Sequence, residues 1–211
     1  MNSLDETRAV LFDMDGVLID AREWHFQALN QALGIFGYNI SQNDHVTRFD
    51  GMTTKSKLSV LSQEEGLPLE LHSLISEVKQ DRTLRIAAAL CYPNMQHQIL
   101  LSRLKTIGIK VGVVTNSIRS TTEFMLNYAG IMKYLDVLVT NEDVSEPKPS
   151  PEGYEKAMKS LGIKPSKTWV VEDGHYGILA AEQAGANVIQ VISPQDVQLE
   201  LFTEIFPEIF V

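Results

Sequence analysis

The chain has 211 residues, of which 44% are hydrophobic and 21% charged, proportions typical of a soluble globular protein with a sizeable core. Its formal net charge of −9 argues against nonspecific binding to nucleic acids or to anionic membranes, and its single cysteine, Cys91, excludes an internal disulfide and a cysteine-rich metal site. Residues 1–8 are polar and acidic, unlike a signal peptide, and no apolar run approaches the length of a membrane span. We therefore expect a cytoplasmic protein with no nucleic-acid or membrane partner.

The first predicted element is a short buried strand, Ala9–Asp13, that ends in two carboxylates. Asp13 and Asp15 follow the apolar run 10–12 with one residue between them, and Gly16 then permits a sharp turn. Open α/β sheets bind their ligands at the C-terminal ends of their strands, where these carboxylates would emerge. Two like charges so close together repel, so a cation or a shared proton is expected between them. An Asp-Gly turn that only ends the strand is the structural alternative.

Residues from about 20 to 91 have the pattern of an inserted helical domain. The segment is far longer than one crossover between parallel strands requires. Apolar residues recur in it with helical spacing, at Phe26, Leu29, Leu33 and Phe36, and again at Leu71, Leu74, Ile75 and Val78. We therefore expect a core formed by residues 1–19 and 92–211, a helical domain formed by residues 20–91, and hinges at Ile19–Ala21 and Leu90–Pro93.

The second half of the chain repeats a helix, a glycine and an apolar strand. Glycines at 108, 130, 162 and 185 each follow a helical stretch, where a left-handed residue commonly ends a helix. The strand-like runs that follow are Val111–Thr115, Val137–Thr140, Thr168–Glu172 and Val188–Val191. With Ala9–Asp13 they predict an α/β fold, a doubly wound, Rossmann-like parallel sheet of about five strands. For the tail, a closing helix or edge element that buries Phe202, Phe206 and Phe210 is the simplest expectation.

Polar residues follow three of these later strands. Thr115-Asn116-Ser117 comes after the second strand, Lys148 lies between two prolines after the third, and Glu172-Asp173 ends the fourth. Taken singly, they are explained by a helix cap, a surface lysine and a polar strand end. Taken together, they converge with Asp13 and Asp15 at one edge of the sheet. Carboxylates without histidine or cysteine favour a hard cation such as Mg²⁺, and a metal with a lysine and free N–H groups suits phosphoryl transfer.

In this order, the motifs resemble those of the haloacid dehalogenase superfamily. That family has Asp-x-Asp-Gly on its first strand, a Thr or Ser that ends the second, then a lysine and an acidic pair, and the resemblance covers nearly the whole chain. The segment 13–25 is most similar to the subgroup that contains β-phosphoglucomutase and small sugar-phosphate phosphatases, and the helical insert is similar to the cap domain of that subgroup.

The resemblance implies a role for each matching residue. Asp13 is the nucleophile that forms an aspartyl-phosphate, and Asp15 is the general acid and then the general base. Mg²⁺ is held by Asp13, the backbone carbonyl of Asp15 and Asp173, with Glu172 acting through water. The phosphoryl oxygens are bound by the Thr115 hydroxyl, the Asn116 backbone N–H and the Lys148 ammonium. Asp15 also argues against dehalogenation, because dehalogenases of the family lack this second aspartate.

The chain departs from the family pattern after the acidic pair and in the insert. Gly174 replaces a small hydroxyl residue, and His175 follows it, where it reaches the substrate or lies on the rim of the site. His25 matches in spacing a histidine that couples cap closure to catalysis, but it could equally be a packed or surface histidine. The mutase's cap arginine has no clean counterpart, although Lys55 and Lys57 are close. Arg48, Arg82 and Arg85 are the other cations of the insert that could meet a substrate.

Three functions remain open from the sequence. The first is a Mg²⁺-dependent phosphatase of a small, sugar-phosphate-like metabolite, as a monomer or small homo-oligomer. The second is a phosphomutase of the β-phosphoglucomutase type, which differs in passing the phosphoryl group to a sugar hydroxyl instead of water. The third is a binding module on an inactive scaffold. For an enzyme, the helical insert is expected to open and close over Asp13 and so control the access of water.

Overall fold

Five short apolar runs form one parallel sheet in the computed structural model, which describes residues 8–210. The strands are β1 (Ala9–Phe12), β2 (Lys110–Val114), β3 (Val137–Val139), β4 (Thr168–Glu172) and β5 (Asn187–Gln190). Their order is β3-β2-β1-β4-β5, and all four pairings are parallel. This confirms the predicted doubly wound α/β fold, with observed strand limits that differ from the predicted ones by at most one residue.

Eight α-helices are present in the described chain. They are α1 (Arg22–Gly34), α2 (Gln42–Thr47), α3 (Thr54–Glu65), α4 (His72–Leu90), α5 (Met95–Thr106), α6 (Arg119–Tyr128), α7 (Glu152–Leu161) and α8 (His175–Gln183). Short 3-10 helices lie at Leu69–Leu71, Met132–Tyr134, Asn141–Asp143, Pro165–Lys167, Pro194–Asp196, Leu199–Phe202 and Pro207–Phe210. None of the helices in residues 8–210 combines the length and the apolar character that crossing a bilayer requires.

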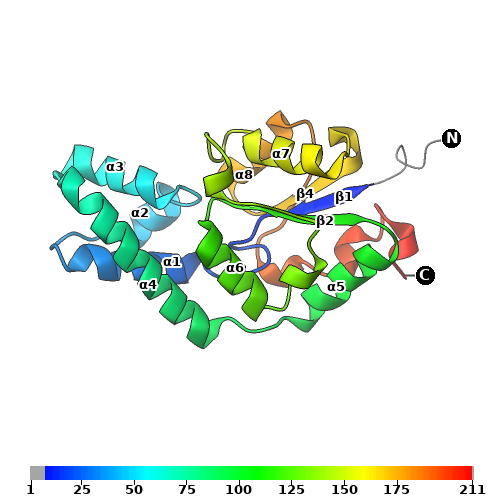
Figure 1. Cartoon of the computed structure of the whole chain (residues 1–211), viewed down its shortest axis with the longest axis horizontal. Helices are drawn as coiled ribbons and strands as arrows, with labels where there is room; N and C mark the ends of the chain where they lie inside the picture. The colour runs from blue at the N-terminus through cyan, green and yellow to red at the C-terminus, as the bar shows by residue number, and fades with distance from the viewer. Residues whose placement is uncertain (1–7, 211) are drawn as a thin grey trace. The chain divides into compact units, whose positions relative to one another are not determined.

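The chain divides into two units, residues 8–20 with 92–210 and Ala21–Cys91. The first unit contains the sheet and α5 to α8. In it, α7 and α8 cover one face of the sheet, and α5 and α6 lie on the other (Figure 1). The α7 and α8 face is filled by small and apolar side chains of these helices packed on Leu11, Val114, Val139 and Val170. Two covered faces explain why these strands read as continuous apolar runs rather than alternating ones.

Left-handed glycines end the helices of this unit, as the sequence predicts. Gly108, Gly130, Gly162 and Gly185 have φ values of 82°, 70°, 68° and 74°. Residues with a Cβ rarely adopt such values, so these glycines fix where each helix ends.

The C-terminal tail packs as successive 3-10 turns and not as one closing helix. Phe202 and Phe206 are fully buried, and their rings stack with centroids 5.9 Å apart, while Phe202 also meets Phe12 of β1 edge-on at 6.3 Å. Phe210 is 53% exposed, and its neighbour Ile209 is buried instead. The expectation for Phe210 was wrong because 3-10 turns present a different face than a continued helical repeat.

The second unit is a helical bundle with its own core, formed by α1 to α4. Leu29 and Leu33 of α1 are buried with Leu58, Leu61 and Ile75. Leu74, which the spacing places on the apolar face, is 47% exposed, so that expectation was wrong. Ile75, predicted on the same face, is fully buried, so the buried face of α4 is narrower than the spacing predicts.

Candidate active site

Asp13 lies where the strand order of the sheet reverses. β1 is paired with β2 on one side and β4 on the other, with Phe12 in register with Val113 and Val171. The chain runs from β1 outward through β2 and β3, and then crosses to β4 and β5. The C-terminal side of such a reversal forms a crevice, because the loops on its two sides diverge. The Asp13 N–H donates to the Val171 carbonyl at 3.0 Å, so the backbone is fixed at this point, and Asp13 is 8% exposed.

Asp15 is carried by a tight turn that folds back beside β1. The Met14 carbonyl accepts from the N–H groups of Leu18 and Ile19 at 3.0 and 2.9 Å, and the Gly16 N–H donates to the Ile19 carbonyl at 2.7 Å. Gly16 has a φ of 96°, which explains the glycine in this motif. The Asp15 carboxylate accepts a hydrogen bond from another strand end, from the Ser117 hydroxyl to Oδ2 at 2.6 Å.

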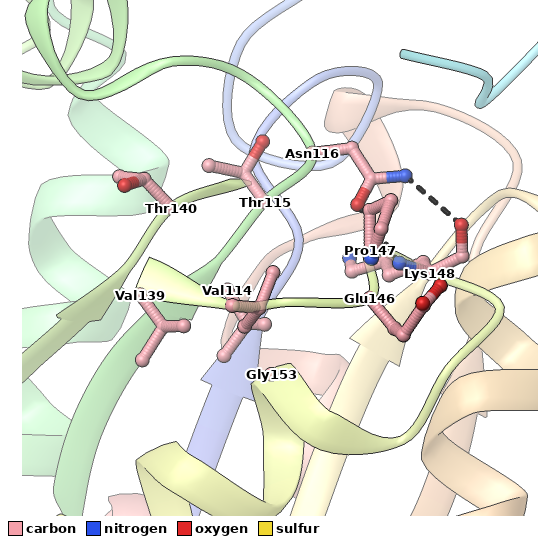
Figure 2. Close-up of a pocket in the computed structure, with 10 residues that line it drawn as sticks. Val114, Thr115, Asn116, Val139, Thr140, Glu146, Pro147, Lys148 and Gly153 are labelled. Atoms are coloured by element: carbon pink, nitrogen blue, oxygen red, sulfur yellow. Dashed lines mark hydrogen bonds between the residues drawn. The ribbon is translucent and has the colours of Figure 1, made fainter. Parts of the chain in front are cut away.

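Lys148 is fixed at both its backbone and its ammonium. Its N–H donates to Asn116 Oδ1 at 3.0 Å, and Asn116 Nδ2 donates to its carbonyl at 3.3 Å, the contact dashed in Figure 2. Its Nζ lies 2.6 Å from both Asp13 Oδ1 and Glu172 Oε1, and the residue is 9% exposed. The peptide bond to Pro149 is cis. The loop therefore directs a lysine inward, toward the ends of β1 and β4.

Glu172 is a buried carboxylate with four hydrogen-bond donors. Besides Lys148, the Tyr154 hydroxyl donates to Oε1 at 2.8 Å, and the N–H groups of Asp173 and Gly174 donate to Oε2 at 3.0 and 3.3 Å. The residue is 2% exposed. A buried carboxylate is tolerated when it is paired and hydrogen-bonded in this way.

Two residues of α7 and α8 complete this environment. Tyr154 is fully buried, and the Lys148 Nζ lies 4.9 Å from the centre of its ring. A Cβ on Gly177 would lie 1.7 Å from Glu172 Oε1 and 2.0 Å from its Cδ. The glycine in the first turn of α8 thus makes room for the carboxylate.

The charges of the site shift one another's protonation. Burial raises the pKa of Asp13, and the negative charges of Glu172, Asp173 and Asp15 raise it further, while Lys148 lowers it, so that the pKa stays well above its ordinary value. Burial lowers the pKa of Lys148, but the carboxylates of Asp13 and Glu172 outweigh this effect and hold it well above the ordinary value. The two carboxylates therefore favour the charged form of Lys148, whereas burial and the neighbouring carboxylates disfavour the charged form of Asp13.

The donor set at this edge fits a hard divalent cation. Carboxylate oxygens of Asp13, Glu172 and Asp173 all lie within 4.8 Å of one another. Three oxygen donors without a thiolate or an imidazole suit Mg²⁺ better than softer metals. The Asp15 side chain lies outside this three-carboxylate group.

Thr115 and Asn116 lie at the C-terminal end of β2, beside the Lys148 loop. The Thr115 N–H donates to the Val139 carbonyl at 3.0 Å, and the Thr115 hydroxyl accepts from the Ser117 N–H at 3.0 Å. Thr115, Asn116 and Lys148 line one pocket together with Thr140 and Gly153, which Figure 2 shows. The three predicted phosphate-binding residues of the core thus share one small region.

The remaining sequence candidates lie in the helical unit or at the surface. His25 is in α1, half-buried, and its Nδ1 lies 3.1 Å from the Lys79 Nζ. Arg48 and Arg85 pair with Glu64 and Asp81 of their own unit at 2.8 Å. Lys57 is buried, Lys55 and His175 are exposed, and Arg82 is half-buried.

Sequence reasoning missed Tyr154 and Gly177, and it gave the Ser117 hydroxyl no role. The spacing of Tyr154 fits an ordinary apolar position of α7, so its polar end gave no signal. Gly177 was visible only as part of a Gly/Ala-rich helix. Ser117 could have been noted from its distance to the end of β2, which parallels that of Asp15 from the end of β1.

Comparison with known proteins is consistent with this geometry. The family model described as haloacid dehalogenase-like hydrolase matches residues 10–191. A validoxylamine A 7'-phosphate phosphatase from Streptomyces hygroscopicus subsp. limoneus is 31% identical, over 90% of this chain and 88% of that protein. A pyrophosphatase PpaX from Bacillus cereus is 30% identical, over 86% of this chain and 82% of its own. Among solved structures, a β-phosphoglucomutase from Clostridium difficile superimposes with a TM-score of 0.82, covering 97% of this chain and 99% of that one, at 21% identity, which shows a shared fold.

Proposed function

The chain belongs to the haloacid dehalogenase-like hydrolase family, and from this membership and the site geometry we propose that it is a Mg²⁺-dependent phosphatase of a small phosphorylated metabolite. The observation that carries the proposal is the buried aspartate at the end of β1, placed 2.6 Å from a lysine and within a group of three carboxylates. The named activities of two relatives, a validoxylamine A 7'-phosphate phosphatase and a pyrophosphatase, support a small phosphorylated substrate.

In the proposed reaction Asp13 attacks phosphorus and forms an aspartyl-phosphate. The oxygen of the departing alcohol takes a proton from Asp15 as its bond to phosphorus breaks. A water molecule then attacks the same phosphorus and gives a proton to Asp15, and the bond to Asp13 breaks to release inorganic phosphate. Splitting one displacement into two lets the chain supply a well-placed nucleophile in the first step and a general base in the second.

Lys148 and the end of β2 provide the phosphate contacts in this proposal. The Lys148 ammonium neutralises part of the phosphate charge, while the Thr115 hydroxyl and the Asn116 backbone N–H donate to phosphoryl oxygens. Since Lys148 is held by Asn116 and Glu172, its charge is placed before substrate arrives. Preorganised donors of this kind stabilise the developing charge without a cost of rearrangement during the reaction.

A Mg²⁺ ion is proposed to be held by Asp13, Asp173 and the Asp15 backbone carbonyl, with Glu172 acting through water. When bound, it supplies positive charge that offsets the repulsion between the carboxylates and an anionic phosphate. Mg²⁺ binding should be measurable by calorimetry and should weaken in Asp173→Asn, apart from any effect on turnover.

The decisive test replaces the nucleophile. Asp13→Asn should abolish the Mg²⁺-dependent hydrolysis of a panel of phosphorylated metabolites, because an amide does not attack phosphorus. A variant that stays within tenfold of the wild type, about 1.4 kcal/mol in barrier height, would rule out the covalent mechanism. Chelation should silence the wild type, and added Mg²⁺ should restore it.

A phosphomutase of the β-phosphoglucomutase type is the alternative proposal. It uses the same core residues and differs in the acceptor of the phosphoryl group. Incubation with a sugar 1-phosphate separates the two, since a 6-phosphate with a bisphosphate intermediate identifies a mutase and free phosphate a phosphatase. A binding module on an inactive scaffold is supported only if no phosphate ester is hydrolysed and another protein is bound tightly.

We further propose that residues 20–91 act as a cap, with His25 among the residues that meet the substrate. Closure would exclude water while Asp13 attacks, and opening would admit the water that cleaves the aspartyl-phosphate. Beryllium fluoride with Mg²⁺ mimics the aspartyl-phosphate and should compact the protein in small-angle scattering. An unchanged radius of gyration would contradict a gating role.

A further inference from the structure

Ser117 joins the turn that carries Asp15 to the end of the neighbouring strand. Its hydroxyl donates to Asp15 Oδ2 at 2.6 Å, although the two residues are 102 positions apart in the chain. The contact follows from the parallel register. Phe12 of β1 pairs with Val113 of β2, so the loops after both strands leave the sheet at the same level.

The backbone of Ser117 is held on both sides. Its N–H donates to the Thr115 hydroxyl at 3.0 Å, and its carbonyl accepts from the Asn141 N–H at 3.2 Å. Thr115 is itself anchored to the end of β3 through its own N–H. The serine hydroxyl is therefore presented from a fixed loop, and a short hydrogen bond from it restricts the rotation of the carboxyl group that it meets.

We propose that Ser117 is a positioning residue for the general acid and base Asp15. This inference rests on the proposed function. A serine has one O–H to donate, and here it is directed to Oδ2, so this hydrogen bond orients the carboxyl group that transfers the proton. In the first step that proton moves from the Asp15 carboxyl group to the leaving oxygen as the bond to phosphorus breaks. In the second step the Asp15 carboxylate takes a proton from the attacking water.

The role predicts a dependence on the leaving group. p-Nitrophenolate departs readily without a proton, whereas the more basic phenolate of phenyl phosphate needs one. A correctly placed general acid contributes roughly 10²- to 10⁴-fold, so a misaligned one should lose a part of this with the poor leaving group. Because kcat/KM reports the steps up to the first irreversible one, it isolates formation of the aspartyl-phosphate.

The experiment compares kcat/KM for p-nitrophenyl phosphate and phenyl phosphate, with Mg²⁺, in the wild type and three variants. Ser117→Ala should lose about tenfold more with phenyl phosphate than with p-nitrophenyl phosphate. Ser117→Thr keeps the hydroxyl and should restore the wild-type ratio of the two values. Ser160→Ala makes the same chemical change at an exposed position of α7 and should leave the ratio unaltered.

Equal losses with both substrates in Ser117→Ala would overturn the inference, because a role in phosphate binding or in folding predicts equal losses. An unaltered kcat/KM with both substrates would overturn it as well. If the wild type hydrolyses both esters and Asp13→Asn does not, a failure belongs to the Ser117 inference alone. If the wild type hydrolyses neither ester, the proposed function and the inference fail together.

Discussion

Replacement of Gly177 by alanine tests the buried network around Glu172. Gly177 lies inside α8, where helix propensity alone predicts that alanine stabilises the protein by about 1 kcal/mol. The structure predicts the opposite sign, since the new Cβ would lie 1.7 Å from Glu172 Oε1 and 2.5 Å from Oε2. Either the carboxylate or the helix must move.

The cost of moving Glu172 follows from its contacts. A side-chain end can often swing aside cheaply, but this carboxylate is buried and accepts from Lys148, Tyr154 and two backbone N–H groups. Breaking a buried ion pair costs about 3–5 kcal/mol. After subtraction of the gain in helix propensity, we expect Gly177→Ala to lower the free energy of unfolding by about 2–4 kcal/mol.

Urea denaturation at neutral pH measures this difference, with Gly34→Ala as the matched control. Gly34 ends α1, and a Cβ built on it has no atom within 4 Å, so the control should be neutral or slightly stabilising. In a Glu172→Ala background the clash disappears, and Gly177→Ala should then become neutral or stabilising. If Gly177→Ala stabilises the otherwise unchanged protein, or destabilises it equally in both backgrounds, the clash is not the cause.

Three further predictions concern buried and paired groups of the core. Tyr154→Phe removes one hydrogen bond to the charged Glu172 and should lower the free energy of unfolding, measured by urea denaturation, by about 1.5–3 kcal/mol. A loss near zero would contradict a stabilising role of the hydrogen bonds around Glu172. Burial lowers the pKa of His97 below its ordinary 6.5, so the unfolded state binds a proton first as the pH falls, and the free energy of unfolding should fall below pH 6.5. His97→Gln keeps a donor toward the Pro194 carbonyl and should flatten this pH dependence. An unchanged slope in the variant argues against His97 as the cause. Burial raises the pKa of Asp143, but hydrogen bonds from Arg119 and Thr140 outweigh this effect and lower the pKa to about 2. Its contribution to stability is therefore present above pH 3.8 and is lost toward pH 2. Asp143→Asn should destabilise the protein clearly at pH 6, and the difference in stability between variant and wild type should shrink in thermal melts at acid pH.

The strands and helix ends were predictable because their signals are local. Buried parallel strands appear as apolar runs wherever helices cover both faces of a sheet, and glycine marks the positive φ that ends a helix. The predicted limits of Thr168–Glu172 are the observed ones for this reason. The exposure of single side chains within the helices was less predictable, as Leu74 and Phe210 show. It depends on which other elements pack against each side of the helix.

Candidate site residues were predictable where a chemical group directly ends a strand. Asp13, Thr115 and Glu172 interrupt apolar runs, and parallel strands bring their ends to one edge. Tyr154 and Gly177 do not interrupt an apolar run. Tyr154 fits the apolar face of α7 by its ring, while its hydroxyl serves a partner on β4, and Gly177 is defined by the volume of a side chain five residues earlier. Neither relation is visible without the packed structure.

Glu172 links the residues that the sequence predicted at the site to Tyr154 and Gly177, which it did not predict. The proposed reaction brings an anionic phosphate to Asp13 and requires the charge of Lys148 beside it, yet a buried ammonium with one partner would be costly. Glu172 supplies a second partner at 2.6 Å, and it is itself stabilised by Tyr154 and by two N–H groups just before α8. Removing the Tyr154 hydroxyl or adding a side chain at Gly177 should therefore disturb Glu172 and, through it, the position of the Lys148 ammonium beside Asp13. Neither Tyr154 nor Gly177 lies at the end of a strand.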